Sequence, residues 1–140
     1  MTDQGDPLAR IADALERLTG AMPAMPDWNA APAYVWDQTG ARPVTQLAAP
    51  TLDLLKGIDA QKALVTANVA RLAAGHAAHD MLLWGARGMG KSALLRASVI
   101  AAQGQDPGTL ALVHVAPDAF AALPRLFGAL GNEARRFLVF

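Results

Sequence analysis

The sequence predicts an α/β fold in which a parallel sheet lies between layers of helices. Short apolar runs at 81–84, 109–115 and 137–140 alternate with segments at 93–101 and 119–130 whose apolar residues recur at helical spacing. Strands that alternate with helices in this way favour parallel pairing through right-handed crossovers. The run at 109–115 is almost wholly apolar, which is expected of a strand that helices cover on both faces.

Length and composition fit one globular domain. Of the 140 residues, 53% are hydrophobic and 17% are charged, which argues against disorder. Twelve basic and twelve acidic residues cancel, so the chain lacks the basic footprint of a nucleic-acid-binding protein. No apolar run approaches the roughly 20 residues that span a bilayer. With no cysteine, the chain has no disulfide, thiolate or cysteine-ligated zinc chemistry.

The N-terminal unit, residues 1–20, is expected to contain an amphipathic helix over 7–19. Asp6 suits the N-cap, Pro7 the first helical position and Gly20 the position just past the end. Such a helix must bury its apolar stripe, either on its own domain or protomer or on a separate partner. The stripe consists of Leu8, Ile11, Ala12, Leu15 and Leu18.

Residues 21–50 are expected to form a linker rich in proline and alanine that crosses a surface. Its aromatic residues Trp28, Tyr34 and Trp36 indicate that part of it is pinned down. A base-stacking platform is the alternative, but no basic residues are interleaved with these rings. The prolines that argue against regular structure are Pro23, Pro26, Pro32, Pro43 and Pro50.

A helix is expected between Asp59, a suitable cap, and Gly75, a suitable stop. Its predicted buried side carries Leu64, Ala67, Val69 and Leu72, and its predicted outer side carries Lys62 and Arg71. The turn that follows contains His76, His79 and Asp80. These could bind a metal ion, but no fourth ligand is evident, so an ordinary polar turn is favoured.

The candidate site is the stretch 85–92, which fits the phosphate-binding pattern G-x-x-x-x-G-K-S/T between a predicted strand and a predicted helix. Its glycines allow positive φ, so several N–H groups can point at one anion, and the following helix adds its N-terminus. Lys91 would place its charge on the β- and γ-phosphates, and the Ser92 hydroxyl would ligate Mg²⁺. The sequence thus predicts binding of a nucleoside triphosphate. The eight predicted residues are Gly85, Ala86, Arg87, Gly88, Met89, Gly90, Lys91 and Ser92.

The helix expected over 119–130 contains Pro124, so a break or kink is predicted there. In the strand 109–115, His114 is the one polar residue, and a hydrogen-bonded histidine is favoured over a catalytic one. The predicted apolar side of the helix carries Phe120, Leu123, Leu126, Phe127 and Leu130.

From about Tyr34 onward the chain resembles the AAA+ branch of P-loop ATPases, and more narrowly the bacterial ATP-binding family catalogued as domain of unknown function 815. The resemblance rests on the stretches 57–62 (GIDAQK), 82–92 (LLWGARGMGKS) and 136–140 (RFLVF). It implies a P-loop NTPase fold with three α/β/α layers, ATP and Mg²⁺ as ligands, and a homo-oligomer formed through the AAA+ domain. Met89 stands where this family more often has threonine, which the loop tolerates because it binds through its backbone.

The resemblance also implies that residues 51–140 are the N-terminal part of the ATP-binding domain of a longer ATPase. In AAA+ proteins, acidic residues that bind Mg²⁺ through water and polarise the attacking water follow the strand equivalent to 137–140. A later strand of those proteins lies between this strand and the one before the phosphate loop. No catalytic residue is therefore assigned in the present chain.

Two functions stay open at this stage. The first is hydrolysis of ATP by a longer protein, and the second is a non-hydrolytic module that uses ATP as a switch. A phosphoryl-transfer kinase is a weaker third option, because the chain shows no acceptor site or lid. The need for ATP and the acidic N-terminus, which carries Asp3 and Asp6 in place of a basic leader, favour the cytoplasm.

Overall fold

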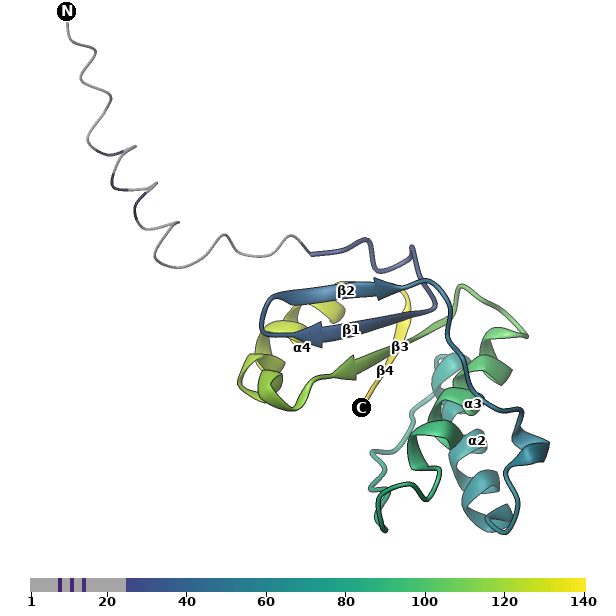
Figure 1. Ribbon diagram of the computed structural model, residues 1–140. Helices are drawn as coiled ribbons and strands as arrows, with labels where there is room; N and C mark the ends of the chain where they lie inside the picture. Colours follow the sequence, from purple (N-terminus) through teal and green to yellow (C-terminus); the bar gives the residue numbers. More distant parts are fainter. Residues whose placement is uncertain (1–7, 9–10, 12–13, 15–24) are drawn as a thin grey trace, which may run out of the picture.

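The computed structural model describes residues 8, 11, 14 and 25–140, and the described residues form a four-stranded sheet with helices on both faces (Figure 1). The strand order is β2-β1-β3-β4. β1 runs parallel to β3 and β3 parallel to β4, whereas β2 is antiparallel to β1. The sheet is therefore mixed where the sequence predicted a parallel one. The strands are β1 (Ala33–Asp37), β2 (Gly40–Val44), β3 (Leu110–Val115) and β4 (Arg136–Val139).

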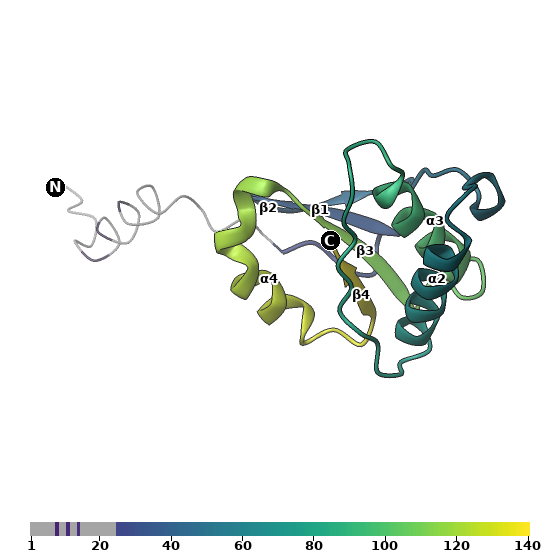
Figure 2. The same ribbon diagram turned by 90° about the horizontal axis from the view of Figure 1, so that it is seen from below.

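Helices cover the sheet from two sides, with α2 and α3 on one face and α4 on the other (Figure 2). One core, which includes Trp36 and Leu126, lies under α4, and a second, which includes Val69 and Val99, lies under α2 and α3. The predicted α/β class is confirmed. The helices are α2 (Asp59–Ala73), α3 (Lys91–Gln103) and α4 (Leu123–Leu130), with the 3₁₀ helices η1 (Leu52–Leu54) and η2 (Pro117–Ala122).

The hairpin of β1 and β2 corrects the linker prediction, because residues 33–44 belong to the sheet. Pro43 is tolerated since β2 is the edge strand, where a missing N–H need not cost a ladder bond. Tyr34 and Trp36 are 1% and 0% exposed, so their rings offer no surface for base stacking. The Tyr34 hydroxyl donates to the Asp27 carbonyl oxygen at 2.7 Å and accepts from the Ala31 N–H at 3.1 Å.

The Arg135 side chain fastens the segment before β1 to the rest of the fold. It is 92% buried, being 8% exposed, and donates from Nη1 and Nη2 to four backbone carbonyl oxygens. Two lie just before β1 and two just before or within β3, and the first two are more than 100 residues from Arg135 in sequence. The acceptors are Trp28 (2.9 Å), Ala31 (2.8 Å), Pro107 (3.0 Å) and Leu110 (3.1 Å).

The apolar run at 81–84 does not form the predicted strand. Residues 77–84 have no regular secondary structure, and Leu82 and Trp84 are each 87% exposed. Leu83 packs against the core under α2 and α3. A strand needs a partner for its N–H and C=O groups, and the described sheet, β2-β1-β3-β4, does not include this run.

The buried face of α2 is shifted from the predicted one. Val69 is buried as predicted, and so is Val65, whereas Ala67 is exposed and Leu64 is 72% exposed. Lys62 was predicted to face outward, but its ammonium donates to two carbonyl oxygens of the 52–55 turn. Periodicity identified the helix, but the position of the neighbouring turn determines which side is covered.

The segment 117–130 changes from a 3₁₀ helix to an α-helix next to Pro124, where a break was predicted. The 3₁₀ helix η2 ends at Ala122 and α4 begins at Leu123, with the proline in its first turn. The predicted apolar side is only partly buried, because Phe120 and Phe127 are 62% and 54% exposed.

The prediction that β3 is covered on both faces holds for Leu110–Val113 but is wrong at His114, which is exposed. The core under α3 contains Leu110 and Leu112, so the helix packs on the first part of the strand and leaves its end open. The His114 ring stacks on Phe140, with centroids 4.7 Å apart.

Of the predicted N-terminal helix 7–19, Leu8, Ile11 and Ala14 are described, and all three are helical and exposed. The rest of that helix, and residues 20–24, lie outside the described residues. No helix in the described part of the chain has the length and apolarity needed to cross a bilayer.

Candidate functional site

The glycines of the loop before α3 have the positive φ values that the sequence predicted. Gly85, Gly88 and Gly90 have φ values of +133°, +85° and +79°. Other residues rarely adopt such values, so the glycines account for the turns of the loop. Gly90 is the N-cap of α3, and its carbonyl oxygen accepts from the Leu94 N–H at 2.9 Å. The first N–H groups of α3 therefore face the loop.

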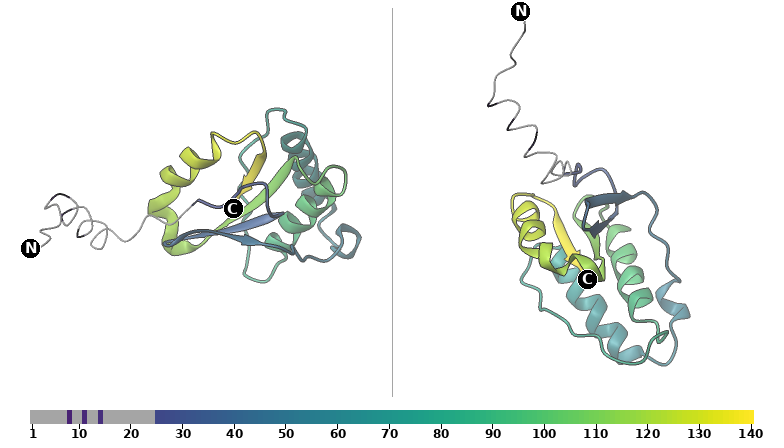
Figure 3. Two further views of the ribbon diagram at one scale, coloured as in Figure 1. Left: turned by 90° about the horizontal axis from the view of Figure 1, so that it is seen from above. Right: turned by 60° about the vertical axis from the view of Figure 1, so that its left-hand side comes forward.

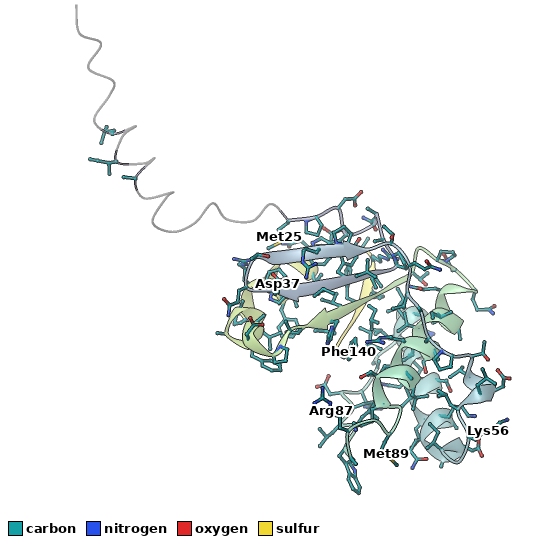
Figure 4. All side chains as sticks on the ribbon, in the orientation of Figure 1. Met25, Asp37, Lys56, Arg87, Met89 and Phe140 are labelled. Atoms are coloured by element: carbon teal, nitrogen blue, oxygen red, sulfur yellow. The ribbon has the colours of Figure 1, made fainter. Side chains whose placement is uncertain are left out.

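The Lys91 side chain folds back across this loop. Its Nζ donates to the carbonyl oxygens of Gly85 at 2.9 Å and Ala86 at 2.7 Å. A cationic group thus lies on the same loop that the helix N-terminus supplies with N–H donors. Arg87 and Met89 extend from the outer part of the loop, and Met89 is 66% exposed (Figure 4).

A cavity of about 290 Å³ opens beside the loop. Its walls are largely apolar, and its polar side chains are Gln61 and Lys91. Lys91 belongs to both the loop and the cavity lining, so a cationic group lies where the polar loop meets the largely apolar cavity. The walls are Ile58 and Gln61 of the α2 start, Leu82, Leu83 and Trp84, the loop residues Gly85, Met89, Gly90 and Lys91, and Leu94 of α3.

Half of the predicted site residues line this cavity. Gly85, Met89, Gly90 and Lys91 do, whereas Ala86, Arg87, Gly88 and Ser92 lie on the same loop but outside the lining. Sequence reasoning missed Ile58, Gln61, Leu82, Leu83, Trp84 and Leu94 as part of the site. A signal for the first two was present in the stretch 57–62, where Gly57, with φ +75°, turns the chain into α2.

Among the described residues no carboxylate lines the cavity. Within the described part of the chain, Asp37 and Asp53 have a lowered pKa, and both lie away from the cavity. A hydrogen bond from the Thr39 side chain is the main cause of the lowered pKa of Asp37, and one from the Thr51 side chain is the main cause of that of Asp53. The hydrogen bonds that cause these shifts lie within turns of the chain, so the shifts do not indicate acid–base chemistry at the loop.

The histidine turn after α2 is held by a neighbouring amide. Asn68 donates to the His79 carbonyl oxygen at 2.7 Å and accepts from the His79 N–H at 2.8 Å. His76 and Asp80 are exposed. Within 25–140 and the three described residues before it, no group of three or more His, Cys, Asp or Glu is placed to hold a metal ion.

Comparison with known proteins identifies a family. The family described as "Protein of unknown function (DUF815)" matches residues 29–140, which include the hairpin, the loop and all four strands. No curated protein and no solved structure matches the chain. The chain therefore belongs to the DUF815 family.

Proposed function

We propose that this chain binds ATP with Mg²⁺ through residues 85–92, as part of an AAA+ type P-loop ATPase that hydrolyses ATP to ADP and phosphate. The observation that carries the proposal is the loop itself. Three glycines with positive φ lead directly into the N-terminus of α3, and the Lys91 ammonium lies across the loop. This combination places N–H donors, the helix dipole and a mobile cation around one anion.

The residues of the chain fit both ligands. The loop N–H groups and Lys91 would hold the phosphates, and Lys91 would exchange its bonds to Gly85 and Ala86 for phosphate oxygens. The Ser92 hydroxyl, in the first turn of α3, would be a protein ligand of Mg²⁺, with phosphate oxygens and water completing the shell. The bound ion would supply charge neutralisation at the phosphates. The apolar cavity beside the loop would take the base.

A non-hydrolytic switch is the second candidate. The observation that favours it is the absence of any carboxylate around the cavity among the described residues. Hydrolysis requires a group that orients the attacking water, and no side chain lining this cavity is an acid. Release of phosphate from Mg²⁺-ATP, measured beside ATP binding, separates the two functions. Turnover supports the ATPase, and binding without turnover supports the switch.

The Lys91→Ala variant tests the phosphate loop. We expect it to lose tight ATP binding in isothermal titration calorimetry, because the main side-chain charge on the phosphates is removed. Lys56→Ala is the matched control, since Lys56 is exposed and does not line the cavity. An unchanged affinity of Lys91→Ala would overturn the proposed site.

A further inference from the structure

The outer surface of η2 and α4 is nearly free of charge. Between residues 117 and 130, Asp118 is the one exposed charged side chain. Arg125 is half-buried, with its guanidinium carbon 4.8 Å from the centre of the Trp36 ring. A helix on the outside of a protein normally carries polar residues on its outer face, and a helix that is apolar all round is normally covered.

Two aromatic rings dominate this surface. Phe120 and Phe127 are 62% and 54% exposed, and Leu123 lies between them at spacings of three and four residues. Leu123 is half-buried against the core under α4. Spacings of three and four place side chains on one side of a helix, so these residues form a single row, here called the Phe120–Phe127 row.

We infer that residues 7–19 of the same chain dock as an amphipathic helix on the Phe120–Phe127 row. Their apolar stripe repeats at the same spacings of three and four as the row. The described members of the segment, Leu8, Ile11 and Ala14, are helical. Leu8 and Ile11 are exposed, at 74% and 55%. Docking removes both apolar surfaces from water at once.

The connection to the sheet favours this occupant over a separate molecule. Trp28 lies in the same core cluster as Leu126 and Leu130 of α4, so the chain enters the fold on the α4 side. Seven peptide steps separate Leu18 from Met25, and an extended chain spans at most about 3.5 Å per step, or roughly 25 Å. A tether this short gives an effective concentration in the millimolar range, which favours intramolecular docking at micromolar protein.

Paired cysteines test the inference directly, because the chain contains none of its own. Ile11→Cys with Phe127→Cys is expected to form an intramolecular disulfide under mild oxidation, seen as a faster-migrating monomer on a non-reducing gel. The matched control is Ile11→Cys with Ala67→Cys, since Ala67 is exposed on α2, on the opposite side of the sheet (Figure 3). We expect the first pair to react about tenfold faster than the control pair or more. Equal rates, or disulfide-linked dimers as the first product, would overturn the inference.

A second variant measures the same contact without a crosslink. Phe120→Ser with Phe127→Ser changes two exposed side chains and leaves the buried core intact. Tryptic cleavage after Arg10 and Arg17 is expected to become about tenfold faster, because an undocked helix opens locally more often. An unchanged cleavage rate in the folded double variant would also overturn the inference.

Discussion

At the scale of single residues, the buried Arg135 and the partly buried Lys62 donate hydrogen bonds to backbone oxygens. Arg135 donates to four carbonyls, and Lys62 to two carbonyls of the 52–55 turn while also pairing with Asp59 at 3.2 Å. Neither role follows from local sequence, because the acceptors are main-chain groups brought together by the fold. In the sequence both residues look like ordinary surface charges.

Replacing Arg135 by methionine tests how much its hydrogen bonds stabilise the fold. The change keeps an apolar stem but leaves the carbonyl oxygens of Trp28, Ala31 and Pro107 without the Arg135 donor. We expect the free energy of unfolding in urea to fall by about 3 kcal/mol. Arg136→Met, at an exposed position, is the control, with an expected change within about 0.5 kcal/mol. Similar losses in both variants would contradict this role for Arg135.

The carboxyl group of Asp37 is expected to make the stability of the fold depend on pH in acid. Hydrogen bonds from the Thr39 hydroxyl and N–H, and from Arg42, hold the pKa of its carboxyl below the ordinary 3.8. Because the folded pKa is lower than the unfolded one, the contribution to stability is complete above about pH 4. It is lost as the pH falls through the folded pKa. Asp37→Asn is expected to lessen the acid dependence of stability in urea titrations below about pH 4. An acid dependence as steep as in the unmodified protein would exclude this role.

At the scale of elements, the predictable parts are those whose signals are local. The loop at 85–92 and the start of α3 follow from glycines and a lysine at fixed spacing, and β3 from a continuous apolar run. The break at Pro124 follows from the proline ring. Which faces of α2 and α4 are buried could not be predicted. Leu64 and Phe127 are as apolar as Val65 and Leu126, and only the neighbouring elements decide which of them is covered.

The sheet shows the same limit of sequence reasoning. Pro43 argued against a strand, but it lies in the edge strand β2, a position that only the strand order reveals. The run at 81–84 argued for a strand, but it pairs with no strand among the described residues. For the candidate site, the loop was predictable, whereas the cavity walls include Ile58, the N-cap of α2, and Leu94 of α3, which only the fold brings together.

Two tryptophans provide a matched test of these elements. Trp36 in β1 is 0% exposed, and Trp84 before the loop is 87% exposed. Trp36→Ala is expected to lower the free energy of unfolding by about 3–5 kcal/mol, because it leaves a cavity in the core under α4. Trp84→Ala is expected to change it by no more than about 0.5 kcal/mol. If urea denaturation gave the reverse order, β1 would not belong to the core.

At the scale of the whole molecule, the described structure has an open sheet edge at β4 and exposed apolar side chains around the candidate cavity. β4 is the outermost strand there, so one edge of its backbone ladder lies open. Leu82, Trp84 and Met89 add exposed apolar surface around the candidate cavity. Open strand edges and apolar patches both promote association.

We therefore expect the 140-residue chain to associate as its concentration rises, measured by size-exclusion chromatography with light scattering. Leu82→Asn combined with Trp84→Asn is expected to shift the mass toward the monomer, because it removes two apolar groups that are each 87% exposed. Leu64→Asn, which changes a 72% exposed leucine on α2, is the control and is expected to have little effect. A monomer at every concentration of the unmodified chain would contradict this expectation.

The position of β1 between β2 and β3 also constrains the order in which the protein can be assembled during synthesis. The β1–β2 hairpin is complete by Val44, but the strand that covers its inner edge begins at Leu110. At roughly 5–20 residues per second, translation leaves that edge unpaired for about 3–13 seconds. The Arg135 bonds to Trp28 and Ala31 form later still. The strands that are made first therefore complete their hydrogen bonds to the rest of the fold last. A nascent chain that stalls before residue 110 exposes the unpaired edge of the β1–β2 hairpin.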